Sequence, residues 1–226
     1  MRIVSLSVFI VVLFSAALGQ SREAALEKLK ELKNQAASLE KTILLPDKKD
    51  IEAAALENVG VFRILPREIY KEGLFDVRGG GAYYSFTNAS HSYDAIPQIS
   101  LEQNGLKVGF YGASYGFMTD LGEIPLAKIN NEDKGVEFLA NYRPPLERSK
   151  ARAEQTRAEG FEIEKTAYKY RLPAVAGHSY LVRAISYDEA DVLVAFKVHR
   201  KDSDGSLIIF WKLLENFEKP ILARNQ

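Results

Sequence analysis

The first pattern along the chain is a short apolar run. Residues 3–14 are almost continuously apolar, and Ala17 and Gly19 place small residues where a signal peptidase cuts. The run holds about 12 residues, whereas a helix that spans a bilayer needs roughly 20. The pattern therefore predicts a signal peptide over residues 1–19, export of the remainder, and no membrane span.

The next pattern is helical and has heptad spacing. Apolar residues recur at intervals of four and three over residues 21–45, and Pro46 ends the helix. Two interpretations stay open: the stripe packs on the body of the same chain, or it pairs with a second copy through residues 25–43. The stripe consists of Ala25, Leu29, Leu32, Ala36, Leu39 and Ile43.

A second helix is expected from Asp47 to Asn58, with Asp47 as its cap and Gly60 just beyond its end. From Val61 onward the pattern changes to short β-rich runs separated by glycine and proline. The sequence thus predicts a helical segment over residues 20–60 and a β-rich domain over residues 61–226.

A β-hairpin is predicted over residues 98–111. Asn104-Gly105 is a favoured two-residue turn, because both central residues adopt positive φ. A two-residue loop fixes the register and puts the apolar residues on one face. The expected pairs are Leu101 with Val108, Ile99 with Phe110, and Glu102 with Lys107.

A second hairpin is predicted near the C-terminus, with a four-residue loop over residues 202–205 that pairs Val198 with Ile209 and Phe196 with Trp211. Further strands are expected over residues 82–87, 161–172 and 180–187, with one inserted helix over residues 146–159. The fold class is α+β: a mainly antiparallel β sheet or sandwich body with two N-terminal helices and one inserted helix.

The composition excludes several classes of function. The chain has 226 residues, with 30 basic and 30 acidic side chains, so it lacks the positive charge that nucleic acid attracts. It has no cysteine, which excludes disulfides, thiolate catalysis and thiolate metal sites. An exported chain without cysteine is typical of the bacterial periplasm or extracellular space. No cofactor is predicted.

One motif suggests catalysis. Gly112-Ala113-Ser114-Tyr115-Gly116 matches G-x-S-x-G, in which a serine nucleophile sits between a strand and a helix. Asp133 or Asp188 followed by His199 could complete a triad. The strand before Ser114 belongs to the predicted antiparallel hairpin, however, and Pro125 leaves little room for a helix. A serine esterase using Ser114 is therefore the alternative hypothesis.

Three other features give weaker signals. The glycines at 79–81 precede a strand, whereas phosphate-binding loops precede a helix. The segment 202–205 lacks the ligands of a calcium loop. His91, His178 and His199 do not have the spacing of a zinc site, so no metal is predicted.

Aromatic residues crowd among glycines between residues 79 and 117, and rings fall on both faces of the predicted strands. Exposed tyrosines give amphipathic contact surface, although the same rings could fill a two-sided core. The leading hypothesis is a non-enzymatic binding or envelope-associated structural protein whose ligand is a glycan or peptide of the cell envelope. The candidate binding residues are Tyr83, Tyr84, Tyr93, Tyr111 and Tyr115.

Overall fold

The computed structural model describes residues 4–68, 75, 77–103, 105–110, 112–130 and 134–223. The chain divides into two compact units, residues 1–43 and 44–226, and each is considered by itself. The division falls before the second helix, whereas the sequence pattern changes at about residue 60.

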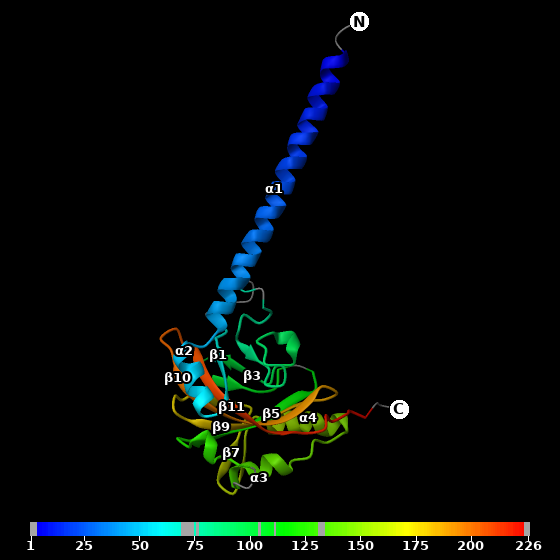
Figure 1. Ribbon diagram of the computed structural model, residues 1–226. Coiled ribbons are helices and arrows are strands. Elements are labelled where there is room, and N and C mark those ends of the chain that lie inside the picture. The colour runs from blue at the N-terminus through cyan, green and yellow to red at the C-terminus, as the bar shows by residue number, and fades with distance from the viewer. Residues whose placement is uncertain are drawn as a thin grey trace. The chain divides into compact units, whose positions relative to one another are not determined.

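The first unit is one long helix. Helix α1 runs from Val4 to Leu44, so the expected helix over residues 21–45 continues without a break from the predicted signal segment (Figure 1). Side chains are described from residue 22 onward, and the large apolar residues of the heptad stripe are exposed. Within the described part of the chain, no helix has the length and apolar character needed to cross a membrane.

The body is built on an antiparallel sheet whose two faces are both buried. Its strand order is β1-β11-β10-β9-β5 (Figure 1). The central strands read as nearly continuous apolar runs, because side chains that point either way are covered. The strands are β1 (Gly60–Ile64), β5 (Ser114–Gly122), β9 (Ser179–Ser186), β10 (Ala190–Lys201) and β11 (Leu207–Asn216).

One face of this sheet packs against a second antiparallel sheet of order β2-β3-β4-β8. Phe62, Met118 and Phe196 of the first sheet meet Leu101 and Leu106 of the second in one core. The strands of the second sheet are short: β2 (Tyr83–Tyr84), β3 (Ile99–Glu102), β4 (Gly105–Lys107) and β8 (Arg171–Pro173).

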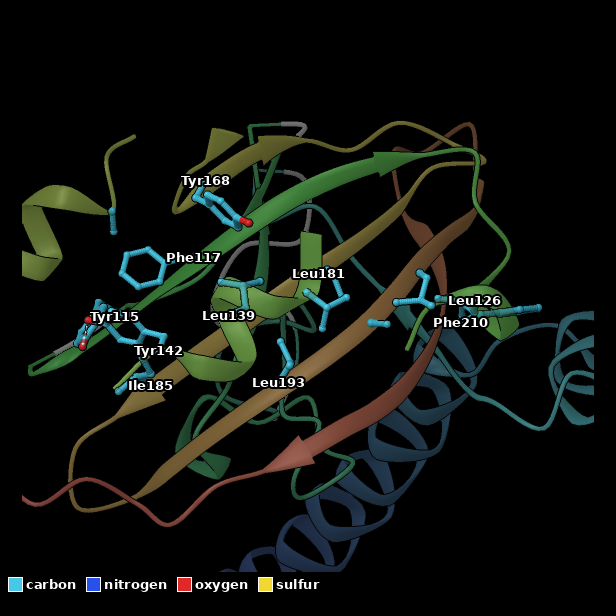
Figure 2. Packing of buried hydrophobic residues seen from close by; sticks show 14 of the residues in the cluster. Tyr115, Phe117, Leu126, Leu139, Tyr142, Tyr168, Leu181, Ile185, Leu193 and Phe210 are labelled. Carbon is cyan, nitrogen blue, oxygen red and sulfur yellow. Dashed lines mark hydrogen bonds between the residues drawn. The ribbon is translucent and has the colours of Figure 1, made fainter. Parts of the chain in front are cut away.

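The other face is covered by helices and a two-stranded ribbon. Figure 2 shows Leu139 of α3 packed with Leu181 and Leu193 of the sheet, and Phe117 and Tyr168 belong to the same core. The α+β class with antiparallel sheets is thus confirmed. The covering elements are α3 (Lys134–Asn141), α4 (Arg148–Arg157), β6 (Phe161–Ile163), β7 (Thr166–Tyr168) and the 3₁₀ turn η2 (Leu126–Lys128).

The first hairpin forms, but its predicted register is wrong by two residues. Leu101 pairs with Leu106, and Glu102 pairs with Gly105. The turn therefore begins at Gln103, which has positive φ, while Asn104 lies outside the described residues. Contacts from other segments hold Gln103 there: Glu68 accepts from its backbone N–H, and its side chain accepts from Arg171. A shift of two keeps Leu101 and Val108 on their predicted face. The predicted pair of Ile99 with Phe110 is not formed, because β4 ends at Lys107 and Phe110 contacts Tyr83 instead.

The predicted pairing of the second hairpin is confirmed. Val198 pairs with Ile209 and Phe196 with Trp211. A register shift between Val198 and Arg200 then moves the pairs nearest the turn by one residue. Lys201 therefore pairs with Leu207, and the four-residue loop predicted over residues 202–205 is wrong, because five residues lie between the paired positions.

The expected strand over residues 161–172 is wrong, because the chain reverses within it. Glu164 and Lys165 both have positive φ and connect β6 to β7, and β8 follows in the other sheet. The inserted helix is confirmed as α4, whereas α3 lies where no helix was predicted. Helix α3 has only eight residues, which is shorter than the window of about 11 residues over which helical periodicity is judged from sequence.

Helix α2 (Lys48–Leu56) belongs to the body. Ala54 reaches the core, and the buried carboxylate of Asp50 accepts a 2.8 Å bond from Arg200 at the end of β10. Arg200 also donates to Asp47, which lowers the pKa of that carboxyl. These ion pairs hold α2 against β10, although the sequence pattern predicts that this helix belongs to a separate helical segment over residues 20–60.

Candidate functional site

Three of the five candidate tyrosines are core residues, so the exposed tyrosine face expected from the sequence is not formed. Tyr83, Tyr84 and Tyr115 are at most 5% exposed. Tyr84 stacks on Phe62 with 3.6 Å between ring centroids, and burial raises its pKa to about 12. Tyr111 lies outside the described residues.

Tyr115 belongs to a hydrogen-bonded cluster with Tyr142 (Figure 2) and Glu154. Its hydroxyl lies 2.8 Å from that of Tyr142, which donates a 2.7 Å bond to Glu154 of α4. Burial raises the pKa of both tyrosines, so both stay protonated at every physiological pH. This arrangement joins α4 to the sheet and commits the hydroxyl of Tyr115 to contacts within the protein.

Tyr93, the fifth candidate, is only half-buried and lines a cavity of about 260 Å³ at the second sheet. Tyr83 lines the same cavity. We call it the ring–cation pocket, because its lining combines aromatic and basic side chains. It is lined by Arg67, Arg78, Gly79, Tyr83, Tyr93, Glu102, Lys107 and Phe110.

The backbone brings these residues together from distant positions. The N–H of Arg67, beyond β1, donates to the carbonyl of Leu101 in β3. The N–H of Tyr93, in the 3₁₀ turn η1 (Tyr93–Ala95), donates to the carbonyl of Arg78. The pocket thus lies where the loops before and after β2 meet the β3–β4 hairpin.

The rings form a wall with edge-to-face contacts. The ring centroid of Tyr83 lies 4.9 Å from that of Tyr93 and 5.4 Å from that of Phe110, with interplanar angles of 79° and 88°. Such T-shaped contacts are favourable and fix ring orientation. The wall is therefore preformed.

A basic side chain lies near each of the three rings. The guanidinium of Arg67 lies 5.8 Å from the centroid of Tyr83, and that of Arg78 lies 5.1 Å from the centroid of Tyr93. The ammonium of Lys107 lies 5.9 Å from the centroid of Phe110. Cation–π attraction holds charges at such distances.

Glu102 forms ion pairs with three basic side chains. Its buried carboxylate accepts from Arg67 at 3.2 Å, from Lys107 at 3.5 Å and from Arg171 at 3.4 Å. Asp94 pairs with Arg78 at the rim. Among these described side chains, four cations face two carboxylates, so the pocket keeps an excess of positive charge and favours an anion.

Most residues of this pocket carry no functional signal in the amino-acid sequence. Glu102 and Lys107 were assigned only to cross-strand pairing, and Phe110 was assigned to the apolar face of a hairpin. Arg67 and Arg78 lie in loops, where no periodicity points to them. The available signal was Arg78-Gly79-Gly80-Gly81, a basic residue beside a glycine turn that leads into β2.

Ser114 does not sit in a nucleophile elbow. It is the first residue of β5, which pairs antiparallel with β9, so a strand follows the serine where the motif requires a helix. Its hydroxyl accepts a 3.1 Å bond from the N–H of Phe110. The two glycines of the motif have structural roles: Gly112 has φ of +54°, and Gly116 packs closely against β9.

The three histidines lie in other places. His91 bonds to the carbonyl of Arg63, and His199 stacks on Phe210. His178 pairs with Asp120, six residues from Ser114 along β5 and thus roughly 20 Å away. The expected triad partner Asp133 lies outside the described residues. Within the described part of the chain, no three His, Asp or Glu side chains gather as a metal site.

His91 makes stability depend on pH. Burial lowers its pKa, so below about pH 6.5 the unfolded chain binds a proton that the folded chain binds less readily. We expect stability to fall, by at most about 1.4 kcal/mol per pH unit, from pH 6.5 down to the folded pKa.

The check is urea unfolding between pH 7.5 and 5 for the wild type and His91→Gln, whose amide can still donate to the Arg63 carbonyl. The wild type should lose stability relative to the variant as pH falls. Parallel pH profiles would contradict the prediction.

Comparison with known proteins adds no relative: no family model, curated protein or solved structure matches the chain.

Proposed function

We propose that this chain is an exported, non-enzymatic binding protein that holds an acidic glycan of the cell envelope in the ring–cation pocket. The observation that carries the proposal is the meeting of three aromatic rings and three cations in one cavity.

Both halves of such a ligand have a complement in the pocket. A uronic acid carries a carboxylate, which Arg78 and Lys107 can meet with charge-assisted hydrogen bonds. Its sugar ring has an apolar C–H face, which suits the half-buried rings of Tyr93 and Phe110. The pocket volume of about 260 Å³ suits one or two sugar units.

The test is calorimetric titration with trigalacturonate as the acidic probe and maltotriose as the neutral one. We expect trigalacturonate to bind, maltotriose not to bind, and affinity to fall as salt rises. Arg78→Gln/Lys107→Gln should weaken binding at least tenfold, because two charge-assisted contacts are lost.

The matched control is Lys49→Gln/Lys150→Gln, which removes the same charge from exposed positions outside the pocket. It should bind like the wild type. Equal loss in both double variants, or binding of triglutamate in place of trigalacturonate, would overturn the proposal.

A further inference from the structure

A second inference concerns α1 and does not rest on the proposed ligand. Helix α1 forms a compact unit of its own, and within that unit the large apolar residues of its heptad stripe have exposed fractions from 42% for Ile43 to 65% for Leu39. Much of the remaining surface is charged, and includes the ion pair between Lys28 and Glu31. A single helix cannot cover its own stripe, so the stripe fits another helix with the same spacing.

The order of large and small residues in the stripe favours one orientation. In a parallel pair each residue meets its own copy, so Ala25 and Ala36 form two underfilled layers. In an antiparallel pair whose facing residue numbers sum to 68, each alanine meets a larger side chain. The facing pairs are then Ala25 with Ile43, Leu29 with Leu39, and Leu32 with Ala36.

The charged residues beside the stripe also favour the antiparallel orientation. In a parallel pair, Lys28 of each helix lies beside Lys33 of the other, which places like charges together twice. In the antiparallel register Lys28 lies beside Thr42, and one Lys33 pair remains near the two-fold axis. We propose that residues 25–43 form an antiparallel coiled coil with a second copy of this chain.

The contact between the two helices is short. Residues 25–43 span about 27 Å of helix, and fewer than three heptads contribute. Such a strip is at the small end of specific interfaces, so the dimer should be weak and reversible.

The first test is sedimentation equilibrium of residues 20–226, the chain that signal cleavage leaves, from 10 µM to 1 mM. The mass should rise from monomer toward dimer. Leu32→Glu/Leu39→Glu should stay monomeric, whereas Asn34→Glu/Ser38→Glu, which adds the same charge on the outer face, should dimerise like the wild type. A wild type that is monomeric at 1 mM, or a seam variant that still dimerises, overturns the proposal.

The second test distinguishes an antiparallel pair from a parallel one by cross-linking. The chain has no cysteine, so an introduced cysteine is the only thiol that can react. In the antiparallel register Gln35 lies beside its own copy, whereas the two copies of Leu39 are about 15 Å apart along the axis. A short bismaleimide should therefore cross-link Gln35→Cys efficiently and Leu39→Cys poorly. The reverse result would show a parallel pair and overturn the register.

Discussion

Replacing Asp191 with asparagine is expected to destabilise the body by about 3–5 kcal/mol, because it leaves the Arg183 guanidinium buried without its counter-ion. Both side chains are at most 2% exposed, and the Nη2 of Arg183 lies 2.8 Å from Oδ2 of Asp191. Arg183 also donates a 2.7 Å bond to the carbonyl of Leu139, near the C-terminal end of α3. The pair therefore joins β9, β10 and a helix end whose carbonyls lack partners within the helix.

Urea unfolding measures this loss, and the double variant Arg183→Met/Asp191→Leu is the control. Removing both charges should recover much of the stability, since no unpaired charge then remains. Full recovery is not expected, because the carbonyl of Leu139 loses its donor. A loss below 1 kcal/mol for Asp191→Asn would show that the ion pair does not need both partners.

Gly116→Val is expected to destabilise the body by about 3 kcal/mol or more, although valine favours strands and glycine does not. A Cβ atom at Gly116 would lie 2.5 Å from a methyl carbon of Val108 and closer still to the carbonyl oxygen of Arg183. Because Val108 packs in the core between the two sheets, β5 cannot move aside without opening that core.

The matched variant is Gly112→Asn at the other glycine of the same motif. Gly112 has positive φ, which asparagine tolerates, and a Cβ there meets no atom within 4 Å. We expect a loss below about 1 kcal/mol at Gly112. Thermal or urea unfolding of the two variants should separate them clearly, and a neutral Gly116→Val would contradict the close approach of β5 and β9.

The two hairpins illustrate how far local sequence goes. Alternation between residues 192 and 211 is enough to pair Phe196 with Trp211, because both strands are long and a one-residue shift would move every side chain to the opposite face of the sheet. In the shorter hairpin at Gln103 the observed register differs from the predicted one by two residues, because a two-residue shift leaves the strand residues on the same face of the sheet. Contacts from Glu68 and Arg171, far away in sequence, decide its register.

The tyrosines show the same limit at the candidate site. Sequence located an aromatic cluster between residues 79 and 117, but it could not tell which rings face the interior. Tyr84 lies in the core between the two sheets, and Tyr115 lies in the core between the first sheet and the helices. Tyr84 and Tyr115 are therefore core residues, and Tyr93 remains at the pocket.

The amino-acid pattern by itself determined the heptad helix, the α+β class, the apolar faces of both hairpins and the absence of cysteine chemistry, because these depend on local spacing and composition. Tertiary structure alone decided the layer order, the buried Arg183–Asp191 pair and the pocket formed by Arg67, Arg78 and Lys107. Those features join residues that are far apart along the chain, and only folding brings their charges and rings within contact distance.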